Sequence, residues 1–173
     1  MATFYIARSE IITPLPWLTF ALPFSLFAPI DVKPFAPNLA MGDRLGFALR
    51  ANATRMKLGG ARVDVVMDAL HGLPKGERAG KRDAIAQEEG AAWVARQGNA
   101  AGFVPRSVVV QSYAARALAG YRGPRKGQPQ FGVLDMVGEV EITDPSAFVA
   151  QLALGFGRAK AFGCGLMMIR RAS

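Results

Sequence analysis

The residues best suited to chemistry lie in a glycine-rich stretch near the C-terminus, where residues 155–165 are GFGRAKAFGCG. Two cations, Arg158 and Lys160, stand between its glycines. The four glycines are Gly155, Gly157, Gly163 and Gly165. Glycine permits positive φ angles and the close approach of another molecule, and successive exposed amides can form a concave anion site. We therefore predict a phosphate-binding loop to which the two cations add positive charge.

The charge of the whole chain indicates which phosphates such a loop could bind. Among 173 residues, 21 lysines and arginines stand against 13 acidic residues, so the net charge is +8. An excess of this size favours a polyanionic partner, most often nucleic acid. The alternative is a generally basic soluble protein. Hydrophobic residues make up 51% of the chain, which is enough for a packed core and too many for a disordered protein.

Soft metal ligands are scarce, because Cys164 and His71 are the single cysteine and the single histidine. One cysteine cannot form an internal disulfide and fits a reducing compartment, so we expect a cytoplasmic protein. One cysteine and one histidine cannot complete a tetrahedral zinc site, and no carboxylate-rich metal cluster is visible in the sequence. We therefore expect no metal and no cofactor, and metal-dependent nuclease chemistry is not expected.

An apolar run without charge extends over residues 11–30. Its length matches a membrane-spanning helix, which needs about 20 apolar residues. Prolines at four positions interrupt it, and each interior proline removes a helix hydrogen bond, which is costly in lipid. We expect a buried, proline-bent segment or an apolar contact with another subunit, and no membrane partner.

Two regions of secondary structure follow from the pattern of apolar residues. The first is predicted as strand, short helix and strand, and its second strand at residues 44–50 alternates with Leu45, Phe47 and Leu49 on one face. Residues 55–61 are polar and glycine-containing, which is typical of a linker. The second region is predicted as β-α-β-β-α-β, and its elements cover residues 62–67, 81–97, 107–113, 131–142, 145–154 and 166–169.

The order β-α-β-β-α-β is that of a ferredoxin-like domain. We therefore predict an α+β protein with tandem ferredoxin-like (RRM-like) domains. The first is only partly present as β-α-β over residues 1–54, and the second is complete over residues 62–173. Within the second domain, Gly98 is expected to cap the first helix and Asp144 to cap the start of the second. Three aromatic residues are expected in the core: Trp93, Phe148 and Phe162. Cys164 is expected to be a small buried residue.

The position of the glycine-rich loop bears on its ligand. A dinucleotide-binding loop follows a strand and opens a helix, whereas this loop is predicted to follow a helix and enter a strand. It also lacks the Gly-Lys-Ser/Thr ending of a P-loop, so a nucleotide cofactor is not expected. Two compatible uses remain, which are tight packing of the helix onto the strand and contact of Arg158 and Lys160 with phosphates.

Three collinear motifs resemble the CasE family, the CRISPR repeat-processing endoribonucleases of the type I-E Cascade complex. The motifs are KPF with Pro37 at 33–37 and GDRLGFALRAN at 42–52, then VDVVMDAL at 63–70, then the loop at 155–165 followed by Leu166. The resemblance implies tandem ferredoxin-like domains that bind the repeat stem-loop and cut at its base without a metal. The attacking group is the RNA's own 2′-hydroxyl, and the product carries a 2′,3′-cyclic phosphate. The resemblance also implies other Cascade subunits as partners and target DNA only through the complex.

The resemblance implies RNA contacts for a set of basic and polar residues. The family's second domain carries a basic hairpin where this chain has residues 116–130, and such a hairpin can reach into a groove of an RNA stem. A solvated loop is the alternative. The hairpin residues expected at RNA are Arg116, Arg122, Arg125 and Lys126. The resemblance implies contact with RNA phosphates for the loop cations Arg158 and Lys160 as well. Arg50 and Asn52 are expected either to touch RNA or to form hydrogen bonds across the two domains.

The catalytic residue cannot be assigned from the sequence. The family's catalytic histidine lies on the first helix of the first domain, and this sequence begins after that helix, at what resembles the third strand. His71 follows the motif at 63–70 and does not match that position, so we expect it to be structural. We therefore expect a CasE-like endoribonuclease, a non-catalytic RNA-binding or assembly subunit, or a generic ferredoxin-like RNA-binding module.

Overall fold

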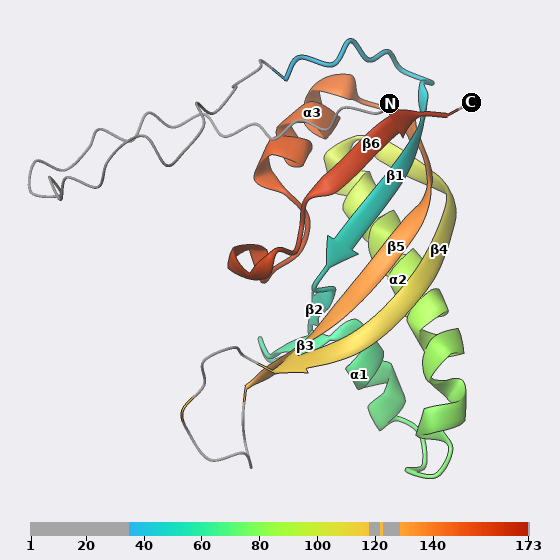
Figure 1. Ribbon diagram of the computed structural model, residues 1–173, viewed down its shortest axis with the longest axis vertical. Helices are drawn as coiled ribbons and strands as arrows, with labels where there is room; N and C mark the ends of the chain where they lie inside the picture. Colours follow the sequence, from blue (N-terminus) through green and yellow to red (C-terminus); the bar gives the residue numbers. More distant parts are fainter. Residues whose placement is uncertain (1–34, 118–121, 123–128, 173) are drawn as a thin grey trace, which may run out of the picture. The chain divides into compact units, whose positions relative to one another are not determined.

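The computed structural model describes residues 35–117, 122 and 129–172. The chain divides into Met1–Asn38 and Leu39–Ser173, and the second unit is built on a four-stranded antiparallel sheet of order β4-β5-β1-β6 (Figure 1). Its main elements are β1 (Arg44–Ala51), α2 (Arg78–Ala101), β4 (Phe103–Ala117), β5 (Gln130–Ile142), α3 (Pro145–Leu154) and β6 (Met167–Arg171). Along the chain these elements follow the order β-α-β-β-α-β, which is that of a ferredoxin-like domain.

The first strand of this domain is not the one that the sequence indicated. We predicted a strand at residues 62–67 as its start and placed residues 44–50 in a separate domain over residues 1–54. β1 instead lies in the centre of the sheet, pairing with β5 from Arg44↔Glu141 to Ala51↔Leu134 and with β6 on its other side. The predicted division between residues 54 and 62 therefore does not separate two sheets. The rest of the predicted first domain falls mainly on residues 1–34, outside the described residues.

A short β-ribbon replaces the predicted linker at residues 55–61. β2 (Thr54–Met56) and β3 (Arg62–Asp64) pair antiparallel, and the turn between them closes through a 2.8 Å hydrogen bond from the Lys57 amide to the Ala61 carbonyl. β3 stops at Asp64, whose carboxylate accepts the amides of Val66 and Met67 at 3.0 and 2.9 Å. This N-cap starts α1 (Val65–His71), so the second half of the predicted strand is helical.

The core lies between the sheet and the two longer helices. Leu45, Phe47 and Leu49 are each less than 5% exposed, which confirms the predicted inward face of β1. Figure 1 shows α2 passing across one face of the sheet. Strand residues that point to the other face, such as Arg50 and Met168, are exposed. In the ranges that the structure describes, this second face is open, and the candidate site below lies on this open sheet face.

Two of the three predicted core aromatics are buried. Trp93 and Phe148 are 2% and 0% exposed. Phe103 packs edge-on against Phe148 and Phe156, with ring centroids 5.6 and 6.0 Å apart. Phe162 is 53% exposed, so its assignment to the core was wrong. Its ring lies on a single turn of 3-10 helix in the glycine-rich loop, where the apolar pattern of the sequence does not determine the direction of the side chain.

Helix α2 is longer than predicted at its C-terminal end. It continues past Gly98 to Ala101, and Gly102 ends it with a φ of 69°. Gly98 is required for a different reason, because a Cβ there would collide with the Phe103 carbonyl oxygen on β4. The glycine therefore allows close contact between α2 and β4, and its prediction as the helix cap was wrong.

Both ends of α3 are as predicted. Asp144 is the N-cap, and its carboxylate accepts the Ala147 amide at 3.0 Å. Gly155 ends the helix with a φ of 72°. The strand after the loop was predicted to be buried, but Met167 is the only buried residue of β6. Met168 and Arg170 alternate with the core-facing residue Met167 and are exposed on the other face of the sheet.

None of the helices in the described ranges is long and apolar enough to cross a membrane. The apolar run at residues 11–30 lies outside these ranges.

Candidate nucleic-acid interface

The glycine-rich loop is anchored to the domain by a buried aromatic ring. Phe156 is fully buried, and its amide donates to the Gly165 carbonyl at 2.8 Å. The Gly165 amide in turn donates to the Arg50 carbonyl at 2.7 Å, which joins the loop to β1. A Cβ at Gly165 would lie 2.6 Å from the Phe156 carbonyl oxygen. The two ends of the loop therefore cross in close contact, and glycine makes the crossing possible.

Several loop amides bind carbonyl groups of the chain itself. The Gly155 amide donates to Gln151 at 2.8 Å, and the amides of Phe162 and Cys164 donate to Ala159 at 2.9 and 3.4 Å. These amides are not available to an anion, so they do not form the predicted concave site. The packing role that we predicted as one use of the glycines is confirmed, as is the burial of Cys164.

The two loop cations differ in what they contact. The Lys160 ammonium donates to the Leu154 carbonyl at 2.6 Å, at the C-terminal end of α3, where positive charge is favourable. The Arg158 amide donates to the Asn52 carbonyl at 3.4 Å, and its side chain is exposed. In the part of the chain that the structure describes, Arg158 forms no ion pair. Arg158 is therefore the loop cation better placed for a phosphate.

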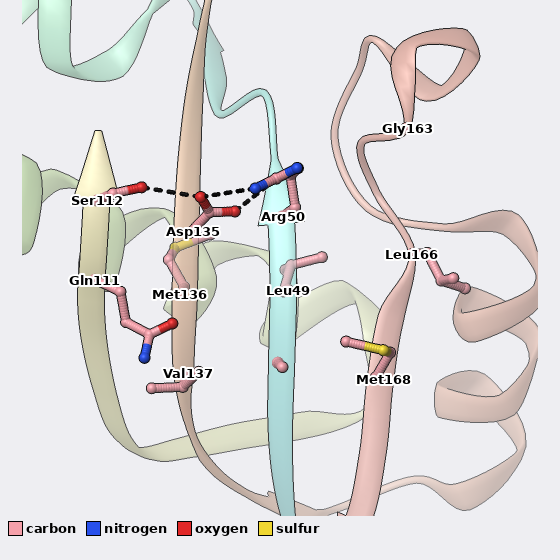
Figure 2. A pocket seen from close by; sticks show the side chains of 11 residues that line it. Leu49, Arg50, Gln111, Ser112, Asp135, Met136, Val137, Gly163, Leu166 and Met168 are labelled. Carbon is pink, nitrogen blue, oxygen red and sulfur yellow. Dashed lines mark hydrogen bonds and ion pairs between the residues drawn. The ribbon is translucent and has the colours of Figure 1, made fainter. Parts of the chain in front are cut away.

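Arg50 belongs to a polar row that crosses three strands of the open sheet face. Figure 2 shows Ser112, Asp135 and Arg50 side by side, one each from β4, β5 and β1. Arg50 donates to the two Asp135 oxygens at 2.7 and 3.1 Å, and the Ser112 hydroxyl donates to Asp135 at 2.9 Å. The hydrogen bonds from Arg50 are the main cause that lowers the pKa of Asp135, although partial burial opposes them. The carboxylate is thus held ionised, and the Arg50 side chain remains 59% exposed.

Asn52 has a structural position. It is 6% exposed, and its side-chain amide donates to the Gly132 carbonyl at 2.7 Å. This bond links the end of β1 to β5, so it lies within one sheet rather than across two domains. Because this buried amide already has a hydrogen-bond partner in the protein, it has little capacity left to bind RNA.

The base of the predicted basic hairpin lies at one end of the sheet. β4 and β5 continue past the end of β1, and their pairing closes at Arg116↔Phe131 and Ala117↔Gln130. Arg116 is exposed, as is Arg122. Arg125 and Lys126 lie outside the described residues, so their predicted contact with RNA stays a prediction.

Two neighbouring hollows of the open sheet face share the row of Ser112, Asp135 and Arg50. The larger has a volume of about 490 Å³ and extends toward Leu166 and Met168. The smaller has a volume of about 240 Å³ and extends toward the base of the hairpin. Neither hollow is lined by a histidine. His71 lies exposed at the end of α1, where its carbonyl accepts from Arg78 at 3.3 Å.

The sequence did not indicate a charge cluster that holds the β2–β3 ribbon. Asp68 on α1 pairs with Arg55 and Lys57, and Arg55 also pairs with Glu89 on α2 at 3.2 Å. Hydrogen bonds from Lys57 and then Arg55 lower the pKa of Asp68. No local motif predicts this cluster, because its members come from the ribbon, α1 and α2, which only the fold brings together. Among the described residues, no group of acidic, histidine or cysteine side chains could hold a metal ion.

Comparison with known proteins connects this domain to CRISPR systems. A family model described as CRISPR associated protein matches residues 18–171. The chain belongs to this family. The resemblance to CasE proteins that the sequence motifs indicated is thereby confirmed. A relative in the family, the CRISPR-associated endoribonuclease Cse3 of Thermus thermophilus, is 30% identical in an alignment of 158 positions that covers 79% of this chain and 60% of Cse3. The chain thus spans about three fifths of the length of this relative.

Solved structures of the family share the fold. Thermus thermophilus Cse3 bound to an RNA representing a pre-cleavage complex aligns with a TM-score of 0.57 at 26% identity, over 82% of this chain and 60% of that chain. Cse3 bound to a 19-nucleotide RNA aligns with a TM-score of 0.60 at 24% identity, over 85% and 67% of the two chains. Cas6e of Escherichia coli aligns with a TM-score of 0.55 at 22% identity, over 83% and 68%. The predicted α+β, ferredoxin-like fold class is confirmed.

Proposed function

We propose that the chain binds the stem-loop of a CRISPR RNA repeat and takes part in cutting that RNA. It then stays with the product as a subunit of a type I-E Cascade complex, and meets target DNA only through that complex. The observation that carries this proposal is the similarity at 26% identity to Cse3 bound to an RNA that represents a pre-cleavage complex. The net charge of +8 supports an RNA ligand.

The exposed arginines of the interface have the chemistry that this binding requires. Arg116 and Arg122 lie at and beyond the end of β4, and Arg158 lies in the glycine-rich loop. A guanidinium binds phosphate with two parallel hydrogen bonds. We propose that these three residues contact the RNA backbone, and that Arg125 and Lys126 extend the contact along the hairpin. Lys160 contributes mainly by fixing the loop that carries Arg158.

Cleavage is proposed to proceed by attack of a ribose 2′-oxygen on the adjacent phosphorus, with release of the 5′-oxygen and formation of a 2′,3′-cyclic phosphate. This reaction requires a group that removes or supplies a proton and cations that stabilise the transition-state charge. Arg158 and Arg116 are candidates for the second task. No residue of the described ranges is assigned the first.

A second candidate function is RNA binding without cleavage. The observation that favours it is that neither hollow of the interface is lined by a histidine, while His71 stands exposed at the end of α1. Such a protein would hold the repeat hairpin as an assembly subunit of the complex.

One experiment separates these functions. The 173-residue protein is incubated in EDTA with a labelled repeat RNA and with a hairpin of unrelated sequence and equal length. Cutting at the base of the repeat stem with a cyclic phosphate end supports processing by this chain. Tight binding of the repeat without cutting supports the second function. Equal affinity for both hairpins contradicts both and indicates a general RNA-binding domain.

A further inference from the structure

The smaller hollow of the open sheet face contains features that backbone binding does not use. It has a volume of about 240 Å³ and lies between the base of the basic hairpin and the glycine-rich loop. Its lining combines two phenylalanines, two arginines and a carboxylate, which are Phe131, Phe162, Arg50, Arg116 and Asp135. We propose that this hollow binds one unpaired nucleobase of the RNA, stacked against Phe162. The proposal rests on the proposed function, because it assumes an RNA ligand.

The aromatic wall is the first reason for this assignment. The rings of Phe131 and Phe162 lie 5.3 Å apart and are tilted by 32°, at a separation where aromatic rings attract each other. Phe131 comes from β5, whereas Phe162 comes from the 3-10 turn of the loop and is 53% exposed. An aromatic pair with one exposed ring offers the kind of platform on which nucleobases stack in RNA-binding proteins.

The charges around the wall distinguish a base from a phosphate. The Asp135 carboxylate is held ionised by Arg50 and Ser112, so it offsets part of the attraction of the two arginines of the hollow for a phosphate. A carboxylate does accept the amino group of a base edge. Arg50 uses two of its five donors on Asp135, which leaves others for a base oxygen or ring nitrogen. The hollow thus fits a polar, planar ring better than a phosphate or a purely apolar side chain.

The position of the hollow explains why the base would be unpaired. Arg116 and Phe131 form the last pair but one of the β4–β5 ladder before the hairpin segment, and Phe162 stands in the same loop as Arg158. An RNA backbone that runs from the hairpin to the loop therefore passes over this hollow. Bases within a stem have both faces covered by stacking, whereas an unpaired nucleotide that flanks the stem can present a free face to Phe162.

The test compares two RNAs, a repeat hairpin that carries unpaired flanking nucleotides and the same hairpin with blunt ends. We expect the flanked RNA to bind the 173-residue protein about tenfold more tightly, a ratio typical of one stacked base. Phe162→Ala removes this ratio and leaves the affinity for the blunt hairpin unchanged, and Phe162→Trp restores it. The control is Leu154→Ala, because Leu154 is also exposed, at 68%, but does not line the hollow. Cooperative urea unfolding with an unchanged slope verifies that the variants are folded.

An abasic flank identifies the recognised group. Replacing the flanking nucleotide by an abasic residue keeps its phosphate and removes its base, so it should weaken binding to the native protein and have no further effect on Phe162→Ala. Additive effects of the two changes would overturn the proposal.

Other outcomes also contradict the proposal, and they separate it from the proposed function. Equal affinity for the flanked and blunt hairpins overturns the nucleobase site while the proposed function stands. Failure of the native protein to bind either hairpin overturns both. A Phe162→Ala effect on self-association or on binding to another protein, without an effect on RNA, would assign the surface to a protein contact instead.

Discussion

The glycine-rich loop contains two phenylalanines, one that anchors the loop in the core and one that lies at its surface. Replacing each by alanine tests this assignment. Phe156 is fully buried and packs on Phe103 at a centroid distance of 6.0 Å, while Phe162 is 53% exposed. We predict that Phe156→Ala destabilises the protein strongly and that Phe162→Ala does so only slightly. Both variants remove the same atoms from the same loop, so each is a matched control for the other.

The expected size follows from burial. Removing a buried phenylalanine ring costs about 3–5 kcal/mol through lost transfer free energy and the cavity left behind. Domains are typically stable by about 5–15 kcal/mol, so Phe156→Ala removes a large part of the free energy of unfolding. Phe162 lies against Phe131 on one side only, and we expect its replacement to cost about 1 kcal/mol or less.

Urea denaturation followed by far-UV circular dichroism measures both values. The slope of free energy against urea should stay constant, so that the midpoints report stability directly. A loss below about 1 kcal/mol for Phe156→Ala, a value expected of surface changes, would show that the loop is not anchored by this ring. Equal losses for the two variants would contradict the assignment of one ring to the core and the other to the surface.

Two further changes test the packing of α2 and the charged row on the sheet. Gly98→Ala should destabilise the protein, because a Cβ there meets the carbonyl of Phe103. Gly80→Ala in the same helix meets nothing within 4 Å and should stabilise the protein by about 0.5–1 kcal/mol in thermal melts. The reverse order of stability would refute the account of this contact. The pKa of Asp135 is lowered in the fold, so its contribution is present above the unfolded-state value of about 3.9 and is lost as the pH falls through the lower folded-state value. Asp135→Asn should therefore be less stable at pH 7 and lose less stability on acidification, as urea midpoints between pH 2 and 7 would report; a parallel pH profile would exclude this role.

The sequence predicts most of the elements because local signals determine them. The alternation of Leu45, Phe47 and Leu49 identified β1 and its buried face, and the Asp-Pro pair at 144 and 145 identified the start of α3. The same alternation cannot say with which strands β1 pairs, since its partners lie far away in the sequence. That is why β1 was placed in the wrong domain although its boundaries were nearly correct.

The roles of individual glycines and cations also depend on contacts that the sequence alone does not reveal. Gly98 in a helical pattern fits either a helix end or a close contact, and only the position of Phe103 decides between them. Lys160 and Arg158 looked equivalent in the sequence, but the fold of the loop brings Lys160 to the end of α3 and leaves Arg158 exposed. Residue type therefore identified the loop as a candidate, and geometry separated the cation that fixes the loop from the exposed one for which we propose RNA contact.

The salt dependence of repeat-hairpin binding tests the central claim most directly, because it counts the phosphates that the interface neutralises. The affinity of the native protein and of the double variant Arg116→Gln/Arg158→Gln is measured from 50 to 300 mM salt, with Arg96→Gln on the exposed side of α2 as the control. We expect the slope of log Kd against log salt to fall by about one unit for each lost phosphate contact in the double variant and to stay unchanged in the control. An unchanged slope in the double variant, or an equal fall in the control, would contradict the proposed RNA interface at the hairpin base and the glycine-rich loop.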